Sequence, residues 1–417
     1  MEEKKENVPN MTSEKKKPKK VIKTDELKFN FFEVLILIFI TALVTVTVTI
    51  TISKLDKNCP VINQQNEDIT RFIEQYNFVL DKYYGSITSK ELIDNAIAGM
   101  IDGLDDPYST YIDKDAATNF DVELEGQFYG LGVEIKQNEN KQVEVVTVLA
   151  GKGAEKAGVQ VGDIITHMDK ESIANLSTTD FRTKMIQNNK ESVTLTIVRN
   201  GESQDITIKR DLVEITSASG KVFESGKAKV GYIRLTIFAS NTGSQFRKAL
   251  EELESQNIDS LIIDVRSNTG GHVTTVTEIL SELLDSSHVI YQEKDAKSTV
   301  KRYSTGTADK KYDIIVLIDG ASASASELLA SALKEQKNAT LVGTKSFGKS
   351  TVQQVIDLED GTKYKITIKE WLTSEGKVIN GQGLTPDKEV NLSEKYFKDP
   401  TDENDDQLQG ALSLLKK

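Results

Sequence analysis

Cysteine is almost absent from this chain of 417 residues, and histidine is scarce. The single cysteine, Cys59, excludes an intramolecular disulfide and any metal site built from several cysteines. A lipid-modified cysteine is preceded by a run of small residues, and no such run precedes Cys59. An unreactive thiol is the preferred interpretation, and a disulfide to another chain stays open. With only three histidines, a catalytic histidine has few candidates.

Positive charge is also in deficit, because 52 basic residues face 64 acidic ones and the net charge is -12. A protein that neutralises the phosphates of a nucleic acid needs a positive face, so the charge argues against nucleic-acid binding. The length exceeds what one hydrophobic core usually supports. Two or more domains are therefore expected.

One long uncharged run is present, at residues 34–52. Its length is close to the roughly 20 apolar residues that cross a bilayer. Lysines crowd residues 15–20 before it, whereas only Lys54 and Lys57 follow nearby, and this bias predicts a cytoplasmic N-terminus. The run is longer than the core of a typical signal peptide, and no A-x-A-like site follows it. We therefore expect an uncleaved single-pass anchor in the cell membrane, with the rest of the chain extracytoplasmic.

The segment after the span predicts helices. Apolar residues recur at helical spacing over 69–83 and again over 92–101, and a Thr88-x-x-Glu91 capping box precedes the second run. An Asp-Asp-Pro turn at residues 105–107 ends this helical segment.

Residues 126–210 change to short alternating strands. The Asn200-Gly201 pair is a strong signal for the tip of a hairpin. This region predicts a small β-rich domain. The expected strands are 143–148, 164–167, 193–198 and 206–208.

Beyond Gly231 strands and helices alternate, which predicts an α/β layered domain whose site forms where strands end and helices begin. An acidic stretch, expected to be mobile, and a last short helix near 408–415 close the chain. The expected strands are 232–235, 261–265, 314–318 and 363–368, and the expected helices are 246–253, 273–284 and 326–334.

The most informative stretch is residues 315–327, where a buried strand runs through small residues into a helix. Such a turn can expose a serine, Ser324, beside the unpaired N–H groups of a helix N-terminus. The alternative is that Ser324 and Glu327 form only a capping box. The decision depends on an activating base.

Three histidines and one lysine are the candidates for that base. His167 lies on an expected strand of the β-rich domain, His288 is expected at the surface, and His272 stays open because it follows a glycine pair at a strand end. Lysine can act instead when burial lowers its pKa. Period-two alternation predicts that Lys349 shares a strand face with Gln353, whose amide would hold the lysine amine.

A second contribution to the site is expected from Gly270 and Gly271, which follow a strand. Glycine lets the backbone approach a substrate closely, so this pair could supply an amide to an oxyanion hole. The other interpretation is a simple tight turn.

Three motifs together resemble the carboxyl-terminal processing peptidases, or tail-specific proteases: residues 322–327 (SASASE), 347–354 (FGKSTVQQ) and 264–271 (DVRSNTGG). The resemblance extends from Leu104-Asp105-Asp106-Pro107-Tyr108-Ser109 to residues 380–387, nearly the whole part after the anchor. It implies Ser324 as nucleophile, Lys349 as general base and Gln353 as its orienting residue. The oxyanion hole would combine Ala325 with an amide of Gly270 or Gly271. Ser350 and His272 depart from common family residues without removing a catalytic group.

The middle domain resembles a PDZ domain. The implied carboxylate-binding loop is Gly130-Leu131-Gly132-Val133, and Gly158, Gly162 and Asp163 match a second PDZ pattern. A PDZ domain binds an extended peptide as an added strand, which suits the capture of a C-terminal tail.

The resulting prediction is a multidomain α/β protein: a crotonase/Clp-protease-like catalytic domain, an inserted PDZ domain, an N-terminal helical segment and one transmembrane helix. It is expected to be a membrane-anchored serine endopeptidase that recognises C-terminal tails of exported proteins, with no metal or organic cofactor implied. The rival is a catalytically inactive PDZ scaffold or tail-binding protein. A homo-oligomer stays open. The expected boundaries are 1–30 basic tail, 31–53 transmembrane helix, 64–125 helical segment, 126–210 PDZ domain, 211–395 catalytic domain and 396–417 acidic stretch with helix.

Overall fold

The computed structural model describes residues 65–307 and 309–415, and the chain divides into two compact units, 1–92 and 93–417. The membrane span predicted at 34–52 lies outside the described residues. Within the part of the chain that is described, no helix is both long and apolar enough to cross a bilayer.

Both helices predicted before the β-rich domain are present, as α2 (Gln65–Lys82) and α3 (Ser89–Asp102). The predicted capping box precedes α3. The Thr88 hydroxyl accepts from the Glu91 N–H at 3.1 Å, and the Glu91 carboxylate accepts from the Thr88 N–H at 2.7 Å. Two first-turn donors are satisfied in this way.

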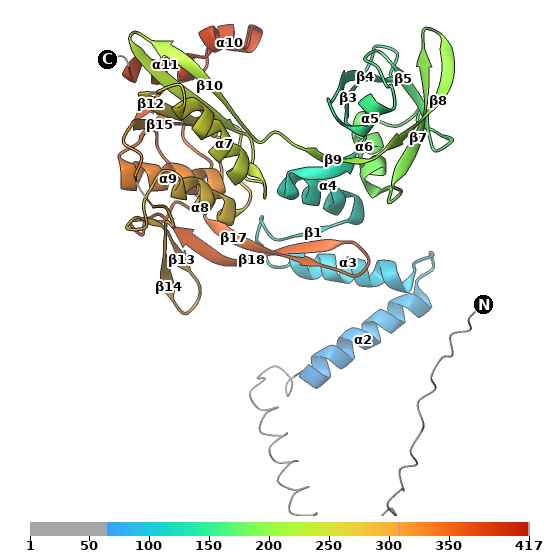
Figure 1. Ribbon diagram of the computed structural model, residues 1–417. Coiled ribbons are helices and arrows are strands. Elements are labelled where there is room, and N and C mark those ends of the chain that lie inside the picture. Colours follow the sequence, from blue (N-terminus) through green and yellow to red (C-terminus); the bar gives the residue numbers. More distant parts are fainter. Residues whose placement is uncertain (1–64, 308, 416–417) are drawn as a thin grey trace, which may run out of the picture. The chain divides into compact units, whose positions relative to one another are not determined.

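A six-stranded sheet forms the centre of the second half of the chain (Figure 1). β10 and β11 are antiparallel, and the neighbours from β11 onward are parallel, as strand–helix alternation predicts. In spatial order the strands are β10 (Ala218–Ser225), β11 (Ala228–Leu235), β12 (Ser260–Asp264), β15 (Asp313–Ile318), β16 (Thr340–Gly343) and β19 (Lys388–Glu389).

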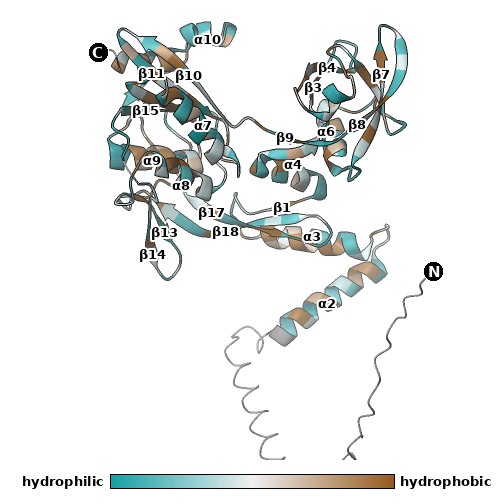
Figure 2. Cartoon of the chain, viewed as in Figure 1, coloured by the Kyte–Doolittle hydropathy of each residue, from teal (hydrophilic) through white to brown (hydrophobic). Residues whose placement is uncertain are grey.

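Helices cover both faces of this sheet. α7 (Thr242–Glu254), α8 (Val273–Ser281) and α9 (Ala325–Lys337) pack with one set of strand side chains, and α11 (Asp406–Leu414) packs with the other. Every residue of β12 is buried, and Figure 2 colours much of α8 and α9 as hydrophobic. A buried parallel strand needs apolar residues on both faces, which explains why β12 and β15 read as continuous hydrophobic runs.

A second sheet includes the two strands that follow Lys349 in the chain, β17 and β18. The hairpin of β17 and β18 is the main part of this sheet, and β1, a three-residue strand from before the β-rich domain, pairs with β18. The segment expected to be helical therefore also contributes a strand to the catalytic domain. The strands are β1 (Thr110–Ile112), β13 (Val289–Lys294), β14 (Thr299–Tyr303), β17 (Thr351–Asp357) and β18 (Lys363–Leu372).

The β-rich domain has its own core and a sheet ordered β3-β4-β5-β7-β8. The predicted hairpin is confirmed, because Asn200 and Gly201 both have positive φ at its tip, as a two-residue hairpin turn requires. Its strands are β3 (Val133–Gln137), β4 (Val143–Val148), β5 (Ile164–Met168), β6 (Glu171–Ser172), β7 (Ser192–Arg199) and β8 (Glu202–Lys209). Its helices are α5 (Gly153–Lys156) and α6 (Thr178–Gln187), while α4 (Lys114–Glu125), β2 (Gln127–Gly130) and β9 (Asp211–Glu214) flank it.

The acidic stretch near the C-terminus was predicted to be mobile, and that prediction is wrong. After α10 (Glu394–Lys398) and a short 3-10 helix (Asp402–Asn404), Asp405 is buried and its carboxylate pairs with the Arg266 guanidinium at 2.8 Å. Arg266 also bonds Asp264. The charge of the Asp405 carboxylate is therefore neutralised by the buried Arg266 guanidinium and is not exposed to solvent.

Candidate active site

Ser324 lies where the buried strand β15 turns into α9. Its backbone has φ 54° and ψ -114°, a conformation that is strained for any residue with a side chain. The following residue, Ala325, is the first of α9, so its N–H belongs to the first turn and has no acceptor within the helix. The predicted strand–turn–helix is confirmed, and the strained turn directs Ser324 toward a cavity.

Glu327 ties the serine turn to the lysine segment. Its buried carboxylate accepts from the Ser324 N–H at 2.9 Å and the Lys349 N–H at 2.8 Å on one oxygen. The other oxygen accepts from the Ser346 hydroxyl at 2.6 Å and the Gly348 N–H at 2.7 Å. Burial raises the pKa of Glu327, while these hydrogen bonds act in the opposite direction. Sequence reasoning saw Glu327 only as half of a capping box, and its spacing from Ser324 carried no signal for the second connection.

The glycine pair lies against the serine. A Cβ on Gly270 would come within 3.0 Å of the Ser324 Cβ and 3.2 Å of the Ala325 nitrogen. The Gly270 N–H already donates to the Asn268 side chain at 2.9 Å. Among the described residues the Gly271 N–H has no acceptor, so Gly271 is the member of the pair whose amide is open to a ligand.

Lys349 lies two residues before β17 rather than within it, so the expected strand face begins only at Thr351. The Gln353 amide donates to the hydroxyls of Thr351 at 2.8 Å and Thr367 at 3.1 Å. Among the described residues, neither Gln353 nor Ser324 forms a hydrogen bond with the Lys349 amine. The pairing of Gln353 with Lys349 expected from alternation is therefore absent in this arrangement.

The surroundings of Lys349 lower the pKa of its amine. Its side chain is half-buried, and burial is the largest cause of a pKa below the usual lysine value. The charge of Lys365 lowers the pKa further, whereas Asp106 and Glu327 act to raise it.

One cavity of about 680 Å³ brings the predicted residues together. Its walls come from α4, from the ends of β12 and β15 and from the β17–β18 hairpin. Ala325 is buried beside it and does not line it. The predicted residues that line this cavity are Ser324, Lys349, Gln353, Gly270, Gly271 and His272.

The histidines separate as follows. His272 lines the cavity, and its Nε2 is buried without a hydrogen-bond partner among the described residues. His167 lies on β5 with Nδ1 3.0 Å from the Thr166 hydroxyl. His288 lies outside the cavity.

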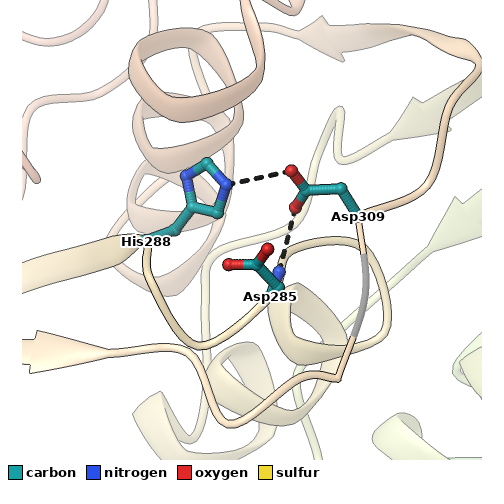
Figure 3. A group of neighbouring side chains, drawn as sticks. All are labelled: Asp285, His288 and Asp309. Atoms are coloured by element: carbon teal, nitrogen blue, oxygen red, sulfur yellow. Dashed lines mark hydrogen bonds and ion pairs between the residues drawn. The ribbon is translucent and has the colours of Figure 1, made fainter.

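His288 belongs to a separate, partly exposed group (Figure 3). Its Nε2 lies 3.2 Å from the Asp309 carboxylate, which also accepts from the Asp285 N–H at 2.9 Å. The Gln336 side-chain oxygen lies 3.2 Å from Nδ1. Because these groups satisfy one another and acidic groups at a surface are common without an ion, we assign no metal to them.

Part of the loop predicted to bind a peptide carboxylate lines a groove between β3 and α6. Leu131, Gly132 and Val133 line this groove, whose cavity is about 650 Å³, together with Phe181 and Met185 of α6. Gly130 is buried at the end of β2 and does not line it. The Leu131 and Gly132 N–H groups have no acceptor within the described ranges.

Comparison with known proteins assigns three parts of the chain to families. Residues 229–390 match the model of peptidase family S41, residues 121–198 match a PDZ domain, and residues 39–116 match the N-terminal domain of the activating protease CtpB.

Two curated relatives cover most of the chain. The carboxy-terminal processing protease CtpB of Bacillus subtilis (strain 168) is 34% identical over 85% of this chain and 76% of its own length. A probable CtpA-like serine protease of Staphylococcus saprophyticus is 32% identical over 79% of this chain and 67% of its own. A solved photosystem II D1 C-terminal processing protease is 25% identical, with 86% of this chain and 92% of that chain covered at a TM-score of 0.46. On the family match and the two curated relatives, the chain is a serine-type carboxyl-terminal processing endopeptidase of peptidase family S41.

Proposed function

We propose that this enzyme cleaves peptide bonds with a dyad in which Ser324 is the nucleophile and Lys349 the general base. The observation that carries the proposal is the single cavity shared by Ser324, Lys349 and Gly271. The burial that lowers the pKa of Lys349 supports it, because only the neutral amine can accept a proton.

In the first half of the reaction, the Lys349 amine takes the proton of the Ser324 hydroxyl while the serine oxygen bonds to the substrate carbonyl carbon. The carbonyl oxygen becomes an oxyanion, which the N–H groups of Ala325 and Gly271 stabilise. The C–N bond then breaks, and the Lys349 ammonium returns its proton to the leaving amine. The product is an acyl-enzyme.

In the second half, Lys349 takes a proton from water, the hydroxide adds to the acyl carbon, and Ser324 leaves with the proton. Gln353 orients Lys349 in this proposal. Its amide would have to turn from Thr351 and Thr367 toward the amine, a side-chain rotation within the same cavity.

The PDZ domain is proposed to capture the C-terminal tail of the substrate. β3 is an edge strand of its sheet, so its outer side can pair with an extended peptide. The free N–H groups of Leu131 and Gly132 suit the terminal carboxylate, and the apolar groove suits the last side chain. An internal bond is then cut in the same polypeptide.

A tail with a free carboxylate should be processed faster than the same tail ending in an amide. Hydrogen bonds to a charged group are worth about 1.5–3 kcal/mol, so kcat/KM should fall about tenfold to a hundredfold on amidation. The assay is cleavage of a folded domain carrying an unstructured tail, with the sites mapped by mass spectrometry. Absence of cleavage with both tails would contradict the proposed endopeptidase.

The control for tail capture is Gly132→Ala. Gly132 has φ 82°, and an added Cβ would lie 2.3 Å from the Lys152 Cβ, so the loop cannot keep its shape. This variant should cleave the acid and amide tails at similar rates. Equal rates already in the unmodified enzyme would show that the loop does not read the carboxylate.

We also propose that the enzyme is anchored in the cell membrane by residues 34–52, with its catalytic and PDZ domains extracytoplasmic. The uncharged run and the lysines before it support this orientation. The full chain should stay in the membrane fraction after alkaline carbonate, and a variant lacking residues 1–53 should be soluble. External protease should degrade the catalytic domain in intact cells stripped of their wall; its protection would reverse the proposed topology.

A further inference from the structure

The turn at residues 105–109 has no part in the reaction described so far, yet it is firmly attached to the catalytic sheet. The Asp106 carboxylate accepts from the Tyr108 N–H at 3.1 Å and the Ser109 hydroxyl at 2.6 Å. The Ser109 hydroxyl in turn accepts from the Thr367 N–H of β18 at 3.0 Å. The turn is therefore fixed to β18 by a chain of hydrogen bonds.

Strand register then determines where Tyr108 lies. β1 follows the turn directly and pairs antiparallel with β18, with Thr110 opposite Lys365. This register brings the Tyr108 ring beneath the catalytic lysine, whose Nζ lies 4.6 Å from the ring centroid. A cation within about 6 Å of an aromatic face is attracted to it, and the attraction strengthens when the pair is shielded from water.

We propose that Tyr108 is a positioning residue of the peptidase site, whose ring binds the charged form of Lys349 and holds the amine at rest. The inference rests on the proposed function, in which Lys349 is the general base. In this resting arrangement the amine contacts the ring, while Gln353 bonds to threonines instead. Loss of the proton weakens the attraction to the ring and releases the amine toward Ser324.

The charges around Lys349 divide into two opposing sets. Burial and Lys365 favour the neutral amine, whereas Asp106, Glu327 and the Tyr108 ring favour the ammonium. Other charged or titratable groups line the cavity farther along, and two of its carboxylates, Asp121 and Asp357, are paired with Lys363. This wider set is Asp121, Glu123, Glu125, His272, Asp357 and Lys363.

Two substitutions should therefore move the pH profile in opposite directions. Activity rises with pH as Lys349 loses its proton, so a change that lowers its pKa raises kcat/KM on the acid side. Tyr108→Leu removes the ring and should raise kcat/KM there about twofold to fivefold, the range set by a cation–π energy at a partly exposed site. Lys365→Met removes a neighbouring positive charge and should lower kcat/KM at the same pH.

The matched control is Tyr108→Phe, which keeps the aromatic face and removes only the phenol. Its pH profile of kcat/KM should match that of the unmodified enzyme, because the attraction comes from the ring. A purely structural role would change KM or stability without moving the acid limb. The inference is overturned if Tyr108→Leu and Tyr108→Phe have the same acid limb in the pH profile of kcat/KM. It is also overturned if Tyr108→Leu and Lys365→Met move that limb in the same direction.

A second measurement separates this inference from the proposed reaction. In a Ser324→Ala background, the reactivity of the Lys349 amine toward acetic anhydride can be followed against pH by mass spectrometry. Tyr108→Leu should increase the reactivity of Lys349 at the lower pH values, and Lys365→Met should decrease it. If the reactivity of Lys349 shifts in this way but the Lys349→Met enzyme is fully active, the dyad is refuted and the ring contact stands. If the reactivity of Lys349 does not change in Tyr108→Leu, only the ring contact is refuted.

Discussion

Replacing Ser324 with alanine should abolish peptide hydrolysis, with kcat/KM reduced at least about 10⁴-fold, as in other serine peptidases stripped of their nucleophile. The fold should survive, because alanine keeps the backbone N–H that donates to the Glu327 carboxylate. Alanine meets the same positive φ as serine, so the strain of the turn is unchanged. Single-turnover cleavage of an unfolded protein measures the loss, and thermal unfolding checks the fold.

The neighbouring serine supplies a matched control for this experiment. Ser326 is fully buried, and its hydroxyl donates to the Asn268 carbonyl at 2.7 Å. Ser326→Ala removes this hydrogen bond, while the Asn268 carbonyl still accepts from the Ala323 N–H at 3.1 Å, so the change should cost about 0.5–1.5 kcal/mol of folding free energy while hydrolysis continues. Ser324→Ala is thus expected to lose activity and keep its stability, whereas Ser326→Ala is expected to lose stability and keep its activity. Hydrolysis that persists in Ser324→Ala at a normal rate would remove Ser324 from the mechanism.

Lys349→Met should reduce kcat/KM by about 10²- to 10⁴-fold, the usual contribution of a general base. Methionine is an unbranched apolar side chain of similar length that lacks the amine. In the active enzyme, kcat/KM should rise with pH through the pKa of Lys349, which burial lowers from its usual value. The rise should therefore begin below the pH at which an exposed lysine titrates. Initial rates measured across a pH series test both statements.

Two further variants make the lysine experiment decisive. Lys345 is exposed and four residues earlier, so Lys345→Met should leave the rate unchanged. His272 shares the cavity, and its Nε2 has no partner among the described residues, so it is the alternative base. His272→Ala should stay active. An inactive His272→Ala enzyme together with an active Lys349→Met enzyme would assign the role of base to the histidine.

The sequence predicted the nucleophile turn well because its information is local. A buried strand, a run of small residues and an amphipathic helix are adjacent in the chain, and β15, Ser324 and α9 follow that order. The same is true of the glycine pair after β12, where φ values of 115° and 139° explain why residues 270 and 271 are both glycine. What could not be predicted was which of the two amides is open, because that depends on the Asn268 side chain.

Non-local features were predicted less well. The alternation argument extended the strand back to Lys349, but β17 starts at Thr351, and the amide of Gln353 bonds across to β18. Glu327 and Tyr108 contact Lys349 from segments that no spacing rule connects to it. Arg266 likewise accounts for the buried Asp405, which composition alone assigned to a mobile tail. In each case a long-range partner overrode a local pattern.

The pairing of β1 with β18 has a consequence for how tails are delivered. The chain enters the PDZ domain from one strand of the catalytic domain, β1, and leaves it for another, β10. In the proposed function, the PDZ domain that captures the tail is joined to the catalytic domain by two covalent connections, and a tethered ligand behaves as if present at about millimolar concentration. Such a local concentration makes tight binding by the PDZ groove unnecessary. Weak, quickly reversible capture would be enough for cleavage, and it would let the trimmed protein depart without a separate release step.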